Sequence, residues 1–424
     1  MTRPIALVLL LALLAPAPLH AQAQPVTVIR DATVLTLGPA GTLERASVVL
    51  RGELIEAVGR ELPVPAGATV IDGRGKVLTP GLFDPYTQLG LKEVDGVKES
   101  VDHDAATSEI GPALDVLDGF NPRSSLIPVN RIEGITRALV APTLGKARLP
   151  LAGRGAVVDL RGALAPRSRW LTRGKVAMFG VLGEAAAEAA GDSRLTSLAR
   201  LREALNELRS EPGPAVARDA LLSALDREAL RPVLAGELPL VLTVHRASDI
   251  ERALDLADEY GLKLVIHGGA EAHLLAGELA RRQIPVILDP SHNLPARFEA
   301  LEARDRAPLL LHQAGVLIAI AQLDDKGTHN SRNLRFLAGN AVARGLPAPV
   351  ALAAISRNPA IIYGLDGRLG TVEAGKLADL VLWSGDPLET TTAAEKVFIQ
   401  GTDIPLVSRQ TQLRDRYLRR GEAR

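Results

Sequence analysis

Short apolar runs alternate with amphipathic stretches through the middle of the chain, from about residue 81 to residue 365. The apolar runs at 240–244 and 264–266 are each followed by a stretch with helical spacing. Leucines at 195, 198, 201, 205 and 208, for example, share one face of a helix. Strand–helix alternation over this length predicts an α/β fold with a parallel sheet, most simply a TIM-type (β/α)8 barrel. A doubly wound open sheet is the alternative, but no Gly-x-Gly-x-x-Gly follows an early strand.

The two ends of the chain carry a different pattern, that of short strands separated by turns. Near the start, strand-like runs flank Arg51-Gly52-Glu53 and also Asp72-Gly73, so we expect a hairpin at each place. These strands are too few for a core of their own, and strand-like runs at 380–383 and 396–399 supply partners. The expected division is a signal segment at 1–23, a composite β-sandwich domain at 24–80 and 366–405, the barrel at 81–365 and a tail at 406–424.

The first 23 residues have the pattern of a secretory signal peptide. Arg3 is their only charge, an unbroken apolar run covers residues 5–14, and Ala21-Gln22-Ala23 is a small-x-small cleavage site. The apolar run is too short to span a bilayer. We therefore expect cleavage after Ala23, no membrane anchor afterwards, and a periplasmic or secreted protein.

Composition narrows the function classes. Lys plus Arg and Asp plus Glu both number 49, so the chain has no general electrostatic attraction to nucleic acid or to an anionic membrane. Cysteine is absent, which excludes disulfides, thiolate zinc sites and a cysteine nucleophile. The expected partner is a small-molecule substrate or ligand, and a homo-oligomer is left open.

Chemistry in a barrel of this kind belongs at the carboxyl ends of the strands. Tyr86 and Gln88 lie at the end of the predicted first barrel strand, separated by one residue. Side chains at this spacing point to the same face of a strand, so both are expected to face the barrel interior.

His245 and His267 directly follow two apolar strand runs. Two neutral imidazoles that converge at a barrel mouth commonly hold zinc, and each histidine alone is more often a satisfied polar group. Asp324 and Asp325 follow the run at 316–320, so either carboxylate is a candidate metal ligand or general base for water, or else a turn residue. His292 and His329 lie close to other strand ends and are candidate substrate-binding residues.

Other polar residues are assigned no chemistry. His273 and His312 are expected on helices with structural roles, and Asp102-His103-Asp104 is expected in a solvated loop. Residues 146–175 hold eight Lys or Arg and one acid, Asp159. This basic segment is either a solvated insertion or an anion-facing lip over the barrel mouth.

Several segments resemble the amidohydrolase superfamily, in particular its periplasmic imidazolonepropionase-like branch. The resemblance covers nearly the whole chain after the signal segment. The segments that carry it are Val77-Leu78-Thr79-Pro80-Gly81-Leu82-Phe83-Asp84, Ile135-Thr136-Arg137-Ala138-Leu139-Val140, Val244-His245-Arg246-Ala247-Ser248-Asp249-Ile250, Asn358-Pro359-Ala360 and Gly370-Thr371-Val372-Glu373-Ala374-Gly375-Lys376-Leu377-Ala378-Asp379-Leu380-Val381-Leu382. The resemblance implies a TIM-type barrel with a discontinuous β-sandwich.

The resemblance also implies metal-assisted hydrolysis and a ligand set. It implies His245 and His267 as metal ligands and Asp324 as the acid of the eighth strand. Lys175 is the nearest candidate for a bridging lysine, and Glu184 is another possible polar group. An ungapped alignment would place Leu323 at the position of that acid. The His-x-His expected after the first strand is replaced by Tyr86 and Gln88, which are poor zinc ligands.

Three functions follow from these observations. The first is hydrolysis of a non-peptide carbon–nitrogen bond, as in a cyclic amide, with zinc or another divalent metal on His245, His267 and Asp324 and with Tyr86 or Gln88 holding the substrate carbonyl. The second is a catalytically inactive homologue that acts as an envelope binding or scaffold protein, without a metal. The third is metal-free acid–base catalysis by His245 and Asp324.

Overall fold

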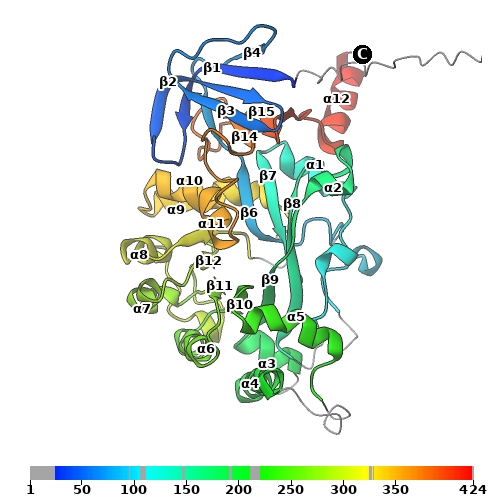
Figure 1. The fold of residues 1–424 in the computed structure, drawn as a ribbon, viewed down its shortest axis with the longest axis vertical. Helices are drawn as coiled ribbons and strands as arrows, with labels where there is room; N and C mark the ends of the chain where they lie inside the picture. The colour runs from blue at the N-terminus through cyan, green and yellow to red at the C-terminus, as the bar shows by residue number, and fades with distance from the viewer. Residues whose placement is uncertain are drawn as a thin grey trace, which may run out of the picture.

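The structure is a computed structural model, and it describes residues 24–94, 96–105, 111–145, 149–190, 193–210, 220–323, 327 and 329–422. Figure 1 shows a β-sheet layer above a barrel surrounded by helices. Among the described residues the helices are α1 (Leu126–Arg131), α2 (Arg167–Trp170), α3 (Glu184–Ala190), α4 (Arg194–Ser210), α5 (Ala224–Leu234), α6 (Ala247–Tyr260), α7 (Ala276–Arg281), α8 (Ala307–Gln313), α9 (Leu334–Ala343), α10 (Ala348–Ala354), α11 (Arg357–Ile362) and α12 (Arg409–Glu422).

Strands from both ends of the chain form one sheet, as the sequence pattern predicts. Its order is β16-β15-β14-β5-β1-β2-β3, and β4 also pairs with β1. The blue N-terminal strands and the orange strand β14 lie side by side in Figure 1. The strands are β1 (Val26–Leu35), β2 (Thr42–Arg51), β3 (Leu54–Gly59), β4 (Thr69–Asp72), β5 (Val77–Pro80), β14 (Leu380–Trp383), β15 (Ala394–Ile399) and β16 (Thr402–Asp403).

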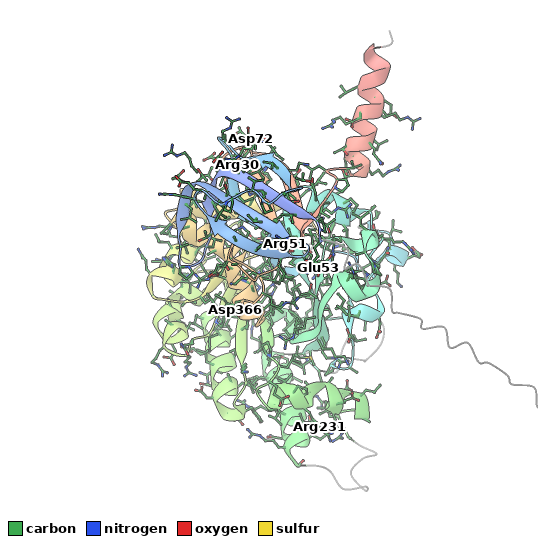
Figure 2. The ribbon with its side chains drawn as sticks, turned by 45° about the horizontal axis from the view of Figure 1, so that its top comes forward. Arg30, Arg51, Glu53, Asp72, Arg231 and Asp366 are labelled. Atoms are coloured by element: carbon green, nitrogen blue, oxygen red, sulfur yellow. The ribbon has the colours of Figure 1, made fainter. Side chains whose placement is uncertain are left out.

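The hairpin expected at Arg51-Gly52-Glu53 is confirmed, because β2 and β3 pair antiparallel around Gly52, whose φ is +56°. Figure 2 shows Arg51 and Glu53 on this sheet, and it shows α12 projecting from the body of the molecule. The hairpin expected at Asp72-Gly73 is wrong. β4 and β5 both run parallel to β1, so Gly73 joins two consecutive segments along one edge of β1. The Gly73 N–H donates to the Arg30 carbonyl at 2.7 Å, which holds the chain against β1 through this step.

A second sheet forms the barrel, in the order β13-β12-β11-β10-β9-β8-β7-β6. It is nearly closed, with β13 facing β6, and it confirms the α/β barrel expected from the alternation. The described barrel strands are β6 (Leu82–Thr87), β7 (Ile135–Val140), β8 (Leu151–Asp159), β9 (Leu171–Val181), β10 (Leu240–Val244), β11 (Leu264–Gly268), β12 (Val286–Leu288) and β13 (Ile318–Ile320).

One barrel strand departs from the regular parallel order. β8 pairs antiparallel with both β7 and β9, so β7 and β9 run in the same direction with a reversed strand between them. The basic segment identified in the sequence covers this region. Its described members include Arg154, which donates to the Ala113 carbonyl at 3.0 Å, and Arg161, which is buried against Asp159. These two arginines therefore stabilise the hairpin rather than form an anion-facing lip.

Three apolar clusters fix these layers in place. One lies against the sheet and includes Ile29, Leu78 and Phe398. Another fills the barrel interior and includes Phe83 and Val241, and the largest lies between the barrel and its helices. Because the barrel interior is filled, only the ends of its strands are free to form a site. Within the described residues no helix has the length and apolar character needed to cross a bilayer.

Candidate functional site

A cavity of about 680 Å³ lies at the carboxyl ends of the barrel strands. Residues at or just past the ends of β6, β7, β9, β10, β11, β12 and β13 line it. The barrel topology therefore brings side chains that are far apart in sequence to one place. A volume of this size suits a small molecule.

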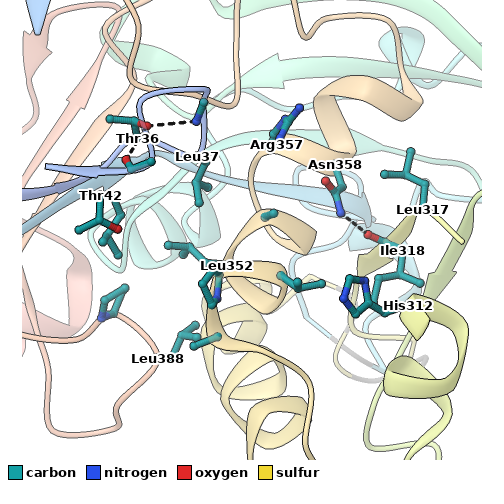
Figure 3. A pocket seen from close by; sticks show the side chains of 18 of the residues that line it. Thr36, Leu37, Thr42, His312, Leu317, Ile318, Leu352, Arg357, Asn358 and Leu388 are labelled. Atoms are coloured by element: carbon teal, nitrogen blue, oxygen red, sulfur yellow. Dashed lines mark hydrogen bonds between the residues drawn. The ribbon is translucent and has the colours of Figure 1, made fainter. Parts of the chain in front are cut away.

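Another cavity, of about 840 Å³, lies between the sheet and the barrel (Figure 3). Leu37, Leu352 and Leu388 are among the mainly apolar residues that line it, and His312 on α8 borders it. It is adjacent to the amino end of β13, which is the opposite end of the barrel from the polar strand termini. We therefore place the candidate functional site at the first cavity.

Tyr86 and Gln88 both line the candidate site, as their spacing predicts. The Tyr86 ring lies against His267, with 3.9 Å between ring centroids, and packs near Phe179 at 5.8 Å. The Gln88 Nε2 donates to the Ala141 carbonyl at 3.4 Å. The two residues at the end of the first barrel strand are thus built into the wall of the cavity.

His245 and His267 lie at the ends of the neighbouring strands β10 and β11 and line the same cavity. The His267 Nδ1 lies 2.8 Å from the Thr243 Oγ1, and the Arg297 Nη2 lies 3.3 Å from the His245 Nε2. These contacts leave the His245 Nδ1 and the His267 Nε2 buried without a hydrogen-bond partner. A pair of orphaned imidazole nitrogens is costly in a fold unless something fills the site.

Electrostatics keeps both imidazoles neutral. Burial, with smaller contributions from the positive charges of Arg297 and His292, lowers the pKa of His245 to about 3. Burial likewise lowers the pKa of His267 to about 3, with a smaller effect from His245. Both rings are therefore uncharged near pH 7 and can accept or donate a hydrogen bond or ligate a metal through a free lone pair.

Gly268 creates the space that His245 occupies. Its φ is +88°, and a Cβ at this position would lie 2.5 Å from the His245 Cε1. Only glycine adopts this backbone without strain and leaves room for the ring. The end of β11 thus positions the imidazole carried by β10.

The described donors do not by themselves fit a catalytic metal. Such zinc sites use three protein ligands, whereas the described residues contain no group of three His, Cys, Asp or Glu that could hold an ion. The two orphaned nitrogens are two donors, and the guanidinium of Arg297 already lies beside one of the rings. Asp324 and Asp325, the acids expected to complete the set, lie outside the described residues.

The other candidates from the sequence divide between the site and its surroundings. His292 lines the cavity, at 4.0 Å from the Asp289 carboxylate. His329 is buried, its carbonyl accepts a hydrogen bond from the Asn130 Nδ2, and it is not among the described residues that line the cavity. His273, expected on a helix, lies in the 3-10 helix Ala272–Leu275 and is buried.

Two further polar groups suggested by the family resemblance lie away from the chemistry. Lys175 is exposed on β9 and is not among the residues lining the cavity. The side chain of Glu184 is exposed at the start of α3, and it is the backbone N–H of this residue that bonds to the Glu299 carboxylate at 2.9 Å. Neither side chain is positioned to act in the cavity.

Sequence reasoning missed several residues of the site. The loop 102–104, expected in solvent, brings His103 and Asp104 to the cavity, where the His103 Nδ1 lies 2.6 Å from the Thr143 Oγ1. Lys92, Arg297 and Glu299 also line it. All of them lie in loops or short turns, where no hydrophobic period indicates the direction of a side chain. The one available signal was their position after a predicted strand.

Comparisons with known proteins agree with this architecture. The amidohydrolase family matches residues 302–404. An amidohydrolase (tasK) from Hapsidospora irregularis is 25% identical over 90% of this chain, which spans only 44% of that relative's length. An imidazolonepropionase from Rhizobium meliloti (strain 1021) is 26% identical over 82% of this chain and 88% of its own.

A solved structure supports the same assignment over most of the chain. The crystal structure of an amidohydrolase from Thermotoga maritima MSB8 is similar with a TM-score of 0.80 and 27% identity, covering 89% of this chain and 99% of that one. The barrel with its polar mouth, the family match over residues 302–404 and these relatives make the chain similar to the amidohydrolase superfamily and, within it, to imidazolonepropionases.

Proposed function

We propose that this protein binds a small molecule at the barrel mouth and hydrolyses a non-peptide carbon–nitrogen bond in it, such as that of a cyclic amide. The observation that carries the proposal is the pair of buried imidazoles, His245 and His267, whose orphaned nitrogens meet a cavity at the carboxyl ends of the strands. Similarity to the amidohydrolase family and to imidazolonepropionases supports it.

Each part of the site has a role in this proposal. Tyr86, Gln88 and His292 line the cavity and hold the substrate carbonyl. Asp324, with His245, is the proposed acid–base group for the attacking water. A zinc ion, which imidazole and carboxylate ligands favour, would require Asp324 beside His245 and His267, because the described residues offer only two donors.

The experiment measures metal content and turnover together. Protein washed in metal-free buffer is assayed by elemental analysis and on a panel of amides and lactams, with and without chelator. We expect turnover that falls at least a hundredfold in His245→Ala and in His267→Ala. His312→Ala, which changes a histidine outside the site, is the matched control. A panel with no turned-over member would refute the proposal, and turnover indifferent to chelator would assign it to metal-free acid–base catalysis.

A second function, non-catalytic ligand binding in the cell envelope, is favoured by one feature of the site. The Tyr86 ring packs on His267, and Arg297 lies against His245, which leaves both imidazoles in contact with protein side chains. The double variant Tyr86→His with Gln88→His tests it. Metal binding that appears only in the variant supports an inactive homologue, whereas wild-type protein that already binds metal and turns over substrate at a comparable rate rules it out.

We also propose that the protein is exported. The pattern of residues 1–23 supports this, although these residues lie outside those described. N-terminal sequencing of protein from an envelope fraction should begin at Gln24. A chain that retains Met1 would contradict the proposal.

A further inference from the structure

The C-terminal helix α12 turns a polar side toward the protein. Ser408 is buried and caps the helix, since its Oγ accepts from the Thr411 N–H at 3.3 Å. Thr411 and Asp415 are half-buried. Because these three positions follow one another at intervals of three and four residues, they lie on one side of the helix. α12 contacts α1, and Figure 2 shows it projecting from the body of the molecule.

The opposite side of α12 carries exposed apolar side chains. Leu413 and Tyr417 lie four residues apart and share one face. Leu413 is two residues from both Thr411 and Asp415, which places it about 200° around the helix from each. The exposed fractions are 37% for Leu413 and 61% for both Tyr417 and Leu418. A helix that packs on a globular core shows the reverse arrangement, with its apolar stripe inward, so this placement suits contact with another body.

Positive charge flanks these apolar side chains. Arg409, Arg414 and Arg416 are exposed, and Arg414 also pairs with Asp415 at 2.7 Å. Residues 406–424 hold six of the 49 Lys and Arg of the chain but two of its 49 Asp and Glu. The neutral charge of the chain therefore conceals an excess of positive charge at α12 and of negative charge elsewhere. A basic amphipathic helix with exposed leucine and tyrosine is typical of helices that lie on membranes.

We propose that α12 docks the protein on the surface of a bilayer that contains anionic phospholipids. Leu413, Tyr417 and Leu418 enter the boundary between headgroups and acyl chains, and the arginines contact lipid phosphates. Its 14 residues extend about 21 Å, less than the roughly 30 Å of the hydrocarbon core, so the helix lies along the surface. The contact is reversible, differs from a membrane anchor, and is independent of the chemistry proposed at the barrel mouth.

The charge and the apolar residues of α12 together favour a membrane over two other partners. A second copy would bring two helices of like charge together, which is unfavourable. A nucleic acid would match the arginines but would place three apolar side chains beside phosphates. The neutrality of the whole chain does not oppose membrane binding, because electrostatic attraction is screened beyond about 10 Å at roughly 0.1 M ionic strength and depends on local charge.

Sedimentation with lipid vesicles tests the proposal. Purified protein that begins at Gln24, and so lacks the apolar run at 5–14, is mixed with vesicles of phosphatidylcholine alone or with about one third phosphatidylglycerol. We expect binding to the anionic vesicles to be at least about tenfold tighter, and most of this gain should disappear at high salt. Absence of binding to either vesicle, or equal binding to both, overturns the proposal.

A triple serine variant tests the apolar contribution. Leu413→Ser, Tyr417→Ser and Leu418→Ser combined should weaken binding to anionic vesicles about tenfold or more, because apolar burial adds to the attraction between charges. The matched control changes three apolar residues of another surface, which are 70%, 81% and 57% exposed: Leu294→Ser, Phe298→Ser and Leu301→Ser. Binding that is lost in the control but kept in the α12 variant overturns the proposal.

A triple glutamine variant tests the charge contribution. Arg409→Gln, Arg414→Gln and Arg416→Gln combined should remove the preference for anionic vesicles. The matched control changes one arginine on each of α4, α6 and α7, whose side chains are 47%, 54% and 68% exposed: Arg200→Gln, Arg252→Gln and Arg281→Gln. Urea denaturation verifies that all variants fold like the wild type. A preference that survives in the α12 variant contradicts the assignment.

Light scattering in the absence of lipid separates the membrane from a second copy. A molecular mass that is unchanged in the apolar α12 variant, together with binding of the wild type to anionic vesicles, supports the proposal. A dimer that becomes a monomer in this variant would assign the apolar face to a second copy and overturn it. Binding of a DNA duplex that the charge variant loses, without binding to vesicles, would overturn it as well.

Discussion

At the scale of single residues, the site depends on how closely β10 and β11 approach each other at their ends. His245 belongs to one strand end, and the absence of a side chain at Gly268 on the other allows its ring to lie there. His267 is fixed from two sides, by the Thr243 hydroxyl and by the face of Tyr86. Small changes in this contact set should therefore alter ligand binding more than they alter the fold.

Gly268→Ala tests this dependence. The new Cβ would lie 2.5 Å from the His245 Cε1 and would displace the ring, so we expect ligand affinity to fall tenfold or more. Gly261→Ala is the matched control, because its φ is also positive (+69°) but nothing lies within 4 Å of its Cβ. Both variants should lose about 1–2 kcal/mol of stability to backbone strain. Equal affinity of the two variants, measured by calorimetry, would contradict the prediction.

Asp84, on β6, gives the protein a pH-dependent stability. Its side chain is 1% exposed, and burial raises its pKa from 3.8 to about 7. Hydrogen bonds from Ser331 and from the Tyr86 N–H have the opposite, smaller effect of lowering the pKa. Because the folded pKa lies above the unfolded one, the fold favours the protonated form. The contribution of Asp84 is therefore fully present below about pH 4 and is lost as the pH rises through about 7.

Asp84→Asn should remove this contribution. Its free energy of unfolding should match that of the wild type near pH 4 and exceed it near pH 8 by a few kcal/mol. Urea denaturation across this range measures the difference in free energy of unfolding between the variant and the wild type. The buried His245 and His267 have the opposite effect of pH on stability, but both proteins contain them, so their contribution cancels in the difference. Asp255→Asn, at an exposed carboxylate, is the control. A constant difference between the two proteins would show that Asp84 does not titrate in this window.

At the scale of elements, a buried ion pair joins the barrel to the sheet. On β7, the Arg137 Nε donates to the Asp379 Oδ2 at 2.5 Å, and its Nη2 donates to the Asp379 Oδ1 at 3.1 Å. Asp379 directly precedes β14, and its Oδ1 also accepts from the Gln400 N–H at 2.8 Å. Arg137 is 1% exposed and also lies 3.6 Å from the Asp159 carboxylate, so removing Asp379 takes away the nearer of two buried partners of its charge.

Asp379→Ala should therefore lower the free energy of unfolding by about 3–5 kcal/mol. Asp403→Ala breaks the exposed pair with Lys396, whose side chains are 44% and 42% exposed, and should cost no more than about 1 kcal/mol. The midpoint of urea unfolding distinguishes the two. The double variant Arg137→Met with Asp379→Leu, which removes both charges, should recover part of the loss. Similar midpoints for the two single variants would refute the assignment.

The elements also show where prediction from the sequence succeeds and where it stops. Tyr86 and Gln88 are two residues apart, and this spacing predicts that both side chains face one cavity. His245 and His267 each follow a strand, and this position predicts that they line the same cavity, because the parallel strands of a barrel end at one mouth. The prediction of a hairpin at Asp72-Gly73 is wrong, because the same residues also suit a turn between two segments that both pair with β1. Arg297 could not be predicted, because a loop has no period that directs its side chains.

At the scale of the whole molecule, the arrangement of the sheet was predictable because neither end of the chain has enough strands alone. What was not predictable is the reversed strand β8, because an antiparallel strand buried on both faces has the same apolar pattern as a parallel one. The polarity of the cavity likewise depends on loops whose path is set by packing. Sequence therefore indicates which end of the barrel carries the chemistry, while the set of contacting groups comes from the fold.

The place of β5 between β1 and β14 has a consequence for biosynthesis. As the chain leaves the ribosome, one edge of β5 stays unpaired until residues beyond 380 have been made. An open strand edge is a template for association with other chains. A message that ends early would release a polypeptide with this edge exposed, so truncated products should aggregate or be degraded rather than accumulate as shorter folded proteins.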